Sequence, residues 1–123
     1  MTEITEVPNN YLDLLNDPKK VTVFGKSYCL RTKKTKSFLK KMKVDFQYVD
    51  IDKLIYPEDQ RFVIDLQAGF MESPKIFIGK KCIGTLKDLL DAQKKGKLAQ
   101  EFEMNEIPYD RTAMNNYNEC RIF

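Results

Sequence analysis

Hydrophobic and polar residues alternate along the chain in short segments that predict a mixed α/β domain. An apolar, β-branched run at 21–24 and an alternating run at 45–51 are both typical of strands. Between them, residues 31–43 place apolar side chains at helical spacing among lysines, which predicts an amphipathic helix. A strand, a helix of this length and a second strand form a βαβ unit, in which the two strands are parallel.

The second half of the pattern predicts a further helix, an antiparallel hairpin and a third helix. Residues 56–68 begin with a proline and acidic residues, as first turns do, and a glycine follows them. Residues 75–84 read as two short strands around a glycine turn, and a capped helix over 86–95 follows. With a short helix near residues 10–15, the order α-βαβ-α-ββ-α predicts a four-stranded mixed sheet with helices on both faces.

The two ends of the chain lack a clear period. We expect residues 1–6 to be polar and loose, and residues 1–9 to form an N-terminal extension. Residues 99–105 are compatible with one short helix, but from Tyr109 onward the apolar residues are isolated among polar ones. We therefore divide the chain into this extension, a domain over 10–98 and a C-terminal extension over 99–123. We interpret the C-terminal extension as a docking arm for another protein, with folding back over its own domain as the alternative.

Composition narrows the class of protein. With 42% hydrophobic and 32% charged residues, the chain has the composition of a folded domain. The net charge is +3, and the basic residues concentrate in the 31–43 helix, which gives the protein one basic face. That helix lacks interleaved aromatic residues beyond Phe38, so we expect no nucleic-acid partner. We expect no membrane span, because no apolar run is long enough, and no metal site, because histidine is absent.

The three cysteines, Cys29, Cys82 and Cys120, are far apart and odd in number, which is not the pattern of a disulfide framework. This usage indicates a reducing compartment, such as the cytoplasm. Cys82 falls on a predicted strand, where we expect a small packing residue. Cys120 stands four residues from the end, as in a prenylation box. No polybasic second signal precedes it, and we do not expect it to be prenylated.

Cys29 is the candidate catalytic residue. It follows the first predicted strand and begins the basic helix, where unpaired N–H groups and the positive end of the helix dipole favour a thiolate. A thiolate is a nucleophile. A small, inert cysteine in a strand–helix turn fits the same position, and the residues alone leave both interpretations open.

Three collinear patterns within residues 10–98 resemble the glutaredoxin family of the thioredoxin fold. They are Val23-Phe24-Gly25-Lys26-Ser27-Tyr28-Cys29, then Ser73-Pro74-Lys75-Ile76-Phe77-Ile78-Gly79, then Ile83-Gly84 followed by Asp88-Leu89. The resemblance implies that Cys29 is the nucleophile and that Pro74 is a cis-proline facing it. It also implies a glutathione site, with Lys26 meeting the glycine carboxylate and Ser73 pairing with the cysteinyl part. The candidate glutathione-binding residues are Lys26, Ser73, Pro74 and Gly84, which match the family's motifs, together with Arg31, which replaces the aromatic residue that usually walls the family's glutathione groove.

The chain departs from the family pattern close to Cys29. Family members carry Cys-Pro-Tyr-Cys or Cys-Gly-Phe-Ser, whereas this chain has Cys29-Leu30-Arg31-Thr32, so no disulfide can form within the motif. Leu86 and Lys87 stand where a small polar residue and an aspartate usually hold the γ-glutamyl end, and Glu72 replaces a threonine. We expect no iron–sulfur role, because Leu30 replaces the small glycine.

Two functions follow from the resemblance and its departures. In the first, the protein is a monothiol, glutathione-dependent thiol–disulfide oxidoreductase that acts on glutathionylated proteins through Cys29. In the second, it is a catalytically weak or inactive glutaredoxin-fold subunit that serves as an interaction module in a larger assembly. The survival of Cys29, Lys26 and Pro74 favours the first.

Overall fold

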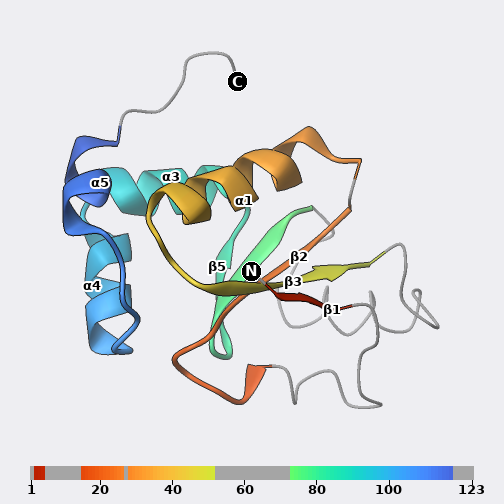
Figure 1. Ribbon diagram of the computed structural model, residues 1–123, viewed down its shortest axis with the longest axis horizontal. Helices are drawn as coiled ribbons and strands as arrows, with labels where there is room; N and C mark the ends of the chain where they lie inside the picture. The colour runs from red at the N-terminus through yellow and green to blue at the C-terminus, as the bar shows by residue number, and fades with distance from the viewer. Residues whose placement is uncertain (1, 5–14, 27, 52–72, 118–123) are drawn as a thin grey trace.

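The computed structural model describes residues 2–4, 15–26, 28–51 and 73–117 (Figure 1). Within these residues the strands are β1 (Thr2–Ile4), β2 (Val21–Gly25), β3 (Phe46–Asp50), β4 (Lys75–Ile78) and β5 (Lys81–Gly84). The helices are α1 (Leu30–Lys41), α3 (Leu86–Lys94), α4 (Lys97–Met104) and α5 (Arg111–Asn116). No helix in these ranges is long and apolar enough to cross a membrane.

The strands form one mixed sheet in the order β1-β3-β2-β4-β5. The parallel pair β2/β3 and the antiparallel hairpin β4/β5 confirm the predicted βαβ unit and hairpin, with β2 and β4 antiparallel at the centre. The four predicted strands are therefore all present, and β1 adds a short fifth strand beside β3. The expectation of a loose N-terminal extension is wrong for residues 2–4. An edge strand offers unpaired backbone groups that any extended segment can satisfy, so β1 needs no apolar period.

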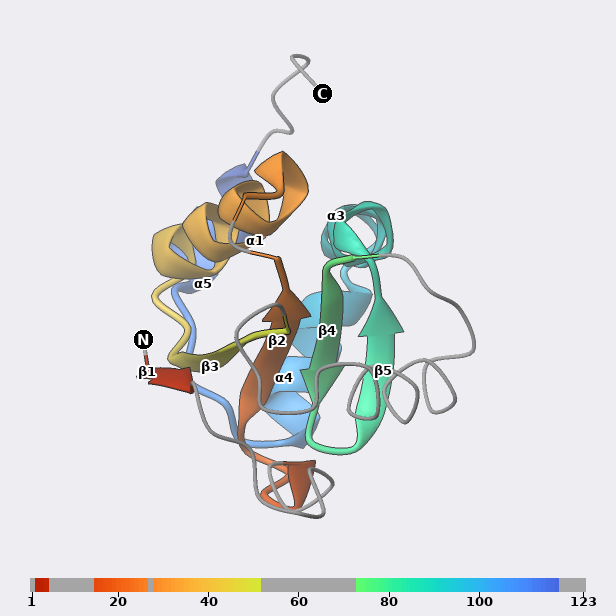
Figure 2. The same cartoon turned by 90° about the vertical axis from the view of Figure 1, so that its right-hand side faces the viewer.

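Strand register decides which side chains face the helices. Val23, Tyr48 and Ile76 lie in register on one face of the sheet, and all three are buried. That face carries the main core, to which every described helix contributes; its helical members include Phe38, Leu39, Leu89, Phe102 and Met114. In Figure 1, α1 and α3 lie above the sheet, and the turned view in Figure 2 places α4 behind β2 and β4.

The opposite face of the sheet is buried as well. Phe24 and Phe77 meet there edge to face, with ring centroids 5.5 Å apart, and both are at most 2% exposed. Side chains buried on both faces are typical of the central strands of an α/β sheet. The helix predicted over 56–68 lies outside the described residues, as does all but Leu15 of the helix predicted near residues 10–15.

The C-terminal segment packs on the domain's own core, which corrects the docking-arm interpretation for residues 99–117. Ile107 and Met114 are 4% and 3% exposed and belong to the main core. The N–H of Asp110 donates to the carbonyl oxygen of Met42 at 2.7 Å, and the Tyr117 ring meets Phe38 edge to face at 4.8 Å.

The sequence pattern missed this packing because the segment is too short and too often interrupted to show a helical period. Its apolar residues each enter the core from a different turn or from the short helix α5. The predicted short helix is confirmed as α4. The predicted boundary between residues 98 and 99 falls inside this helix. Residues 118–123, with Cys120, lie outside the described part of the chain.

Candidate active site

Cys29 is the N-cap residue of α1, just beyond the end of β2. Its N–H donates to the carbonyl oxygen of Lys26 at 3.0 Å, which closes a tight turn, and its own carbonyl oxygen accepts the N–H of Lys33 at 3.2 Å. An N-cap side chain lies beside the unpaired N–H groups of the first helical turn. The thiol therefore stands at the positive end of the helix, as the sequence pattern indicated.

The pKa of the Cys29 thiol lies below the ordinary value for a cysteine. Partial burial raises the pKa, but the nearby backbone N–H and hydroxyl of Thr32 lower it. The backbone N–H of Arg31 and its guanidinium charge lower it further. The net direction favours the thiolate, which is the nucleophilic form of cysteine.

Thr32 stands where family members with two active-site thiols have the second one, and it is fully buried. Its side chain lies directly against the backbone of Gly25, since a Cβ atom added there would come within 2.6 Å of Thr32 Oγ1. This close approach explains why the strand ends in glycine. Within the described residues Thr32 Oγ1 has no well-formed hydrogen bond, so its proton can turn toward a charged sulfur beside it.

The peptide bond between Ser73 and Pro74 is cis, as predicted. Pro74 is buried and directly precedes β4, whose Lys75 pairs with Phe24 of β2. By this register Pro74 lies beside Gly25, at the end of the sheet from which the chain leads to Cys29. The structure thus brings Ser73, Pro74 and Cys29 to one end of the sheet.

Two cations lie close to Cys29 in the chain, and one of them, Arg31, acts on its thiol. Lys26 is half-buried, and its Nζ lies 5.9 Å from the centroid of the Tyr28 ring. Arg31 is exposed on the first turn of α1, and its charge acts on the Cys29 sulfur. Positive side chains in this position stabilise a thiolate and attract the carboxylates of an incoming ligand.

Gly84 and the start of α3 lie at the same end of the sheet as Pro74, since Gly84 pairs with Ile76 of β4. Gly84 has a φ of 116°, and a Cβ atom there would come within 2.3 Å of Asp88 Oδ2. The Asp88 carboxylate accepts the N–H of Thr85 at 3.0 Å and its hydroxyl at 3.2 Å, so it caps α3. Leu86 is buried in the core, whereas Lys87 is exposed.

Asp88 is the candidate site residue that the sequence patterns did not single out for a role. Its carboxylate sits beside Gly84, close to where the family's γ-glutamyl pocket is expected. A Thr85-to-Asp88 capping box is visible in the sequence and is the signal from which its position could have been inferred. A carboxylate here can receive an ammonium group, which Lys87 cannot.

The pKa of the other described cysteine is shifted in the opposite direction from that of Cys29. Cys82 is a free, half-buried residue on β5, where it pairs with Phe77. Burial raises the pKa of its thiol, and a nearby Asp88 charge adds to the rise, against smaller lowering effects of the Gly84 N–H and Lys75. Cys82 is therefore protonated at neutral pH, in keeping with the packing role expected of it.

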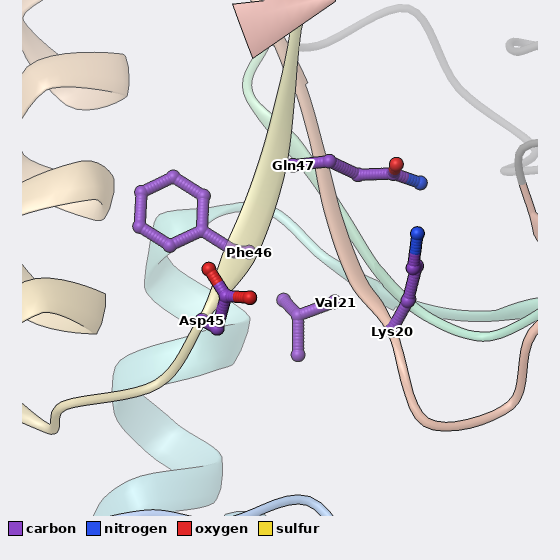
Figure 3. A pocket seen from close by; sticks show the side chains of 5 residues that line it. All are labelled: Lys20, Val21, Asp45, Phe46 and Gln47. Atoms are coloured by element: carbon purple, nitrogen blue, oxygen red, sulfur yellow. The ribbon is translucent and has the colours of Figure 1, made fainter. Parts of the chain in front are cut away.

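A small hollow of about 70 Å³ lies at the other end of the sheet (Figure 3). It is lined by Lys20, Val21, Asp45, Phe46 and Gln47, at the start of β2 and β3. Because Cys29 follows the opposite end of β2, this hollow takes no part in thiol chemistry. Across the described residues no group of three or more potential metal-ligating side chains gathers.

Comparison with known proteins gives one family. The family model for glutaredoxin matches residues 21–83. Rabbit (Oryctolagus cuniculus) Glutaredoxin-1 is 32% identical over 84 residues, which cover 66% of this chain and 79% of the relative. Monothiol glutaredoxin-S12 of Arabidopsis thaliana is 33% identical over 79 residues, 63% of this chain and 44% of the relative. The crystal structure of a buckwheat glutaredoxin–glutathione complex superimposes with a TM-score of 0.71 at 23% identity, covering 77% of this chain and 86% of that one.

Proposed function

The chain belongs to the glutaredoxin family, and we propose that it is a monothiol thiol–disulfide oxidoreductase that acts on glutathione mixed disulfides through Cys29. The observation that carries the proposal is the N-cap position of Cys29, where Thr32 and Arg31 lower the pKa of its thiol. The cis-proline at the same end of the sheet supports it. Thr32 replaces the second cysteine of the motif, which leaves one thiol. The mixed disulfide at Cys29 must therefore be resolved by an external thiol.

The proposed reaction has two exchange steps. The Cys29 thiolate attacks the glutathione sulfur of a protein–glutathione disulfide, that S–S bond breaks, and the protein leaves as a thiolate that takes a proton from water. A glutathione thiolate then attacks the mixed disulfide at Cys29. This step forms oxidised glutathione, half of which comes from the substrate, and restores the Cys29 thiolate. One free glutathione is therefore oxidised for each protein thiol that is released.

Glutathione is placed in this proposal by complementary charges and backbone groups. Lys26 receives the glycine carboxylate with Arg31 nearby, and Ser73 beside Pro74 pairs with the cysteinyl part. At the far end, the Asp88 carboxylate beside Gly84 receives the γ-glutamyl ammonium in place of the usual aspartate. The buckwheat protein of the same fold was solved as a complex with glutathione, which supports this choice of ligand.

An interaction module without catalysis is the second candidate. The observation in its favour is that Leu86, which replaces a small polar residue of the glutathione pocket, is buried in the core and offers no polar group. On this candidate the protein is a subunit of a larger assembly. For both candidates we propose a reducing compartment, such as the cytoplasm, which is where widely spaced, odd-numbered cysteines are usually found.

A coupled assay tests the proposal. Reduced glutathione, glutathione reductase and NADPH are mixed with the disulfide between glutathione and 2-mercaptoethanol, and NADPH loss is followed. We expect turnover by the wild type and by Cys82→Ser, and none by Cys29→Ser. We also expect no reduction of insulin disulfides by a dithiol route. Absence of turnover by the wild type, together with absence of glutathione-dependent NMR shifts near Lys26, would leave the interaction module as the function.

A further inference from the structure

Helix α1 presents an exposed stripe that begins next to the thiol. Spacings of three and four residues align its members along the outward side of the helix, and all of them are exposed: Leu30, Lys33, Ser37, Lys40 and Lys41. We call this set the α1 stripe. From Leu30 to Lys40 it extends for about 15 Å, which is the length of about five residues of extended peptide.

The α1 stripe has no acidic residue of its own. Residues 28–44 contain no aspartate or glutamate. Two neighbouring lysines have partners: Lys43 Nζ lies 3.5 Å from Asp110 Oδ2, and Lys41 Nζ lies 6.0 Å from the centroid of the Tyr117 ring. Within the described part of the chain, Lys33 and Lys40 make no side-chain ion pair or ring contact. Lys33 near the start of the stripe and Lys40 near its far end are therefore available to an outside anion.

Folding does not account for these charges. The first turn of a helix is stabilised by acids and destabilised by cations, and the first turn of α1 has no acid but begins with Arg31 and Lys33. Each misplaced cation costs a few tenths of a kcal/mol. A partner that brings negative charge to this turn offsets that cost.

Apolar side chains lie on both sides of the nucleophile. Tyr28 is 71% exposed and Leu30 is 64% exposed, and they are two of the three large apolar side chains that are exposed in the described ranges. Exposed apolar groups that adjoin a charged stripe are typical of a protein-binding surface. Glutathione alone does not need the far end of this stripe.

We propose that the α1 stripe binds an acidic segment of a glutathionylated protein, next to its modified cysteine. The inference rests on the proposed function and specifies its substrate class: cysteines flanked by aspartate or glutamate are preferred. Tyr28 and Leu30 contact the residues adjoining that cysteine, while Lys33 and Lys40 attract the carboxylates. Electrostatic attraction of this kind acts mainly on the rate of association.

Two glutathionylated peptides of equal length test the inference in the coupled assay. One carries glutamates and the other lysines on both sides of the modified cysteine. At low ionic strength we expect the wild type to turn over the acidic peptide about tenfold faster per unit concentration. The preference should shrink in 0.5 M salt, where charges are strongly screened. The double variant Lys33→Glu, Lys40→Glu should lose or invert the preference.

A matched control separates a local effect from net charge. Lys95→Glu with Lys97→Glu makes the same charge change at exposed positions beyond the far end of α3, and it should keep the wild-type preference. Each protein's rate on a peptide is divided by its own rate on the small mixed disulfide with 2-mercaptoethanol, which removes any effect of the substitutions on the reactivity of Cys29. Equal rates on the two peptides, or equal effects of the two double variants, would overturn the inference.

A binding measurement keeps the inference testable if the protein shows no turnover. Cys29→Ser is titrated into fluorescently labelled, unmodified acidic and basic peptides and into a single-stranded DNA oligonucleotide of equal charge to the acidic peptide. Tighter binding of the acidic peptide, lost in the Lys33→Glu, Lys40→Glu background, supports the inference even if the proposed function fails. Tighter binding of the DNA would contradict it.

Discussion

Thr32 is fully buried against Gly25, and its backbone N–H and hydroxyl both act on the Cys29 sulfur. A threonine cannot form a disulfide, but it can donate a hydrogen bond to a thiolate. At the level of single residues, the substitution therefore removes the internal resolving thiol and keeps a donor beside the nucleophile. This combination suits a reaction in which glutathione resolves the mixed disulfide.

The first prediction concerns that hydroxyl. Thr32→Val replaces the hydroxyl with a methyl group of similar size, so we expect the pKa of Cys29 to rise and thiolate chemistry below that pKa to slow by about tenfold, the value of a hydrogen bond to a charged group. Thr32→Ser should stay close to the wild type. The measurement is the rate of iodoacetamide alkylation against pH in a background with Cys82 and Cys120 replaced by serine.

The direction of the pH effect follows from the thiolate being the reactive form. Because the pKa of Cys29 is lowered, its alkylation rate should reach half-maximum at a lower pH than that of an ordinary thiol. Cys82, whose pKa is raised, should react only at higher pH in a Cys29→Ser variant. An unchanged profile in Thr32→Val would show that the hydroxyl only fills space.

At the level of the elements, the first turn of α3 serves both the stability of the helix and the proposed binding of glutathione. Asp88 holds the Thr85 N–H and lies against Gly84, so one carboxylate both caps the helix and sets the charge at that end of the site. A cap of this kind is worth about 1 kcal/mol. The same carboxylate can bind the ammonium of a γ-glutamyl group, which the positively charged Lys87 cannot do.

The second prediction separates the two roles of Asp88. Asp88→Asn keeps an oxygen acceptor for the Thr85 N–H and removes the charge, so we expect Tm to change little and the KM for glutathione to rise severalfold. Asp88→Ala should lower Tm as well, because the cap is lost. If Asp88→Asn leaves the KM for glutathione unchanged, the carboxylate serves α3 alone.

At the scale of the molecule, the parts that could be predicted were those with a local signature. β2, α1, β3 and the hairpin each show their own period or turn residue, and the motif around Cys29 and Pro74 lies at their ends. β1 and α5 were missed because their place depends on partners distant in sequence. β1 pairs with the open edge of β3, and α5 packs on the core beside Phe38. The charge state of Cys29 likewise depends on Thr32 being buried, which no spacing reveals.

The last prediction tests whether the C-terminal segment belongs to the fold. Removing residues 106–123 takes Ile107 and Met114 out of the core, together with the hydrogen bond between Asp110 and Met42 and the ring contact between Tyr117 and Phe38. Burial of the two apolar side chains alone contributes about 3–6 kcal/mol, a large share of the 5–15 kcal/mol that holds a domain together.

We therefore expect this truncated protein to unfold at a much lower temperature or to lose cooperative unfolding, as measured by circular dichroism. The matched control removes only residues 118–123 and keeps every described contact of α5, so its Tm should stay close to that of the full chain. Because Cys29 caps the start of α1, and Phe38 of the same helix packs on Tyr117, the longer truncation should also slow thiol exchange at Cys29. An unchanged Tm after the longer truncation would mean that the segment does not stabilise the domain. Residues 106–117 would then again be interpreted as a docking arm for another protein.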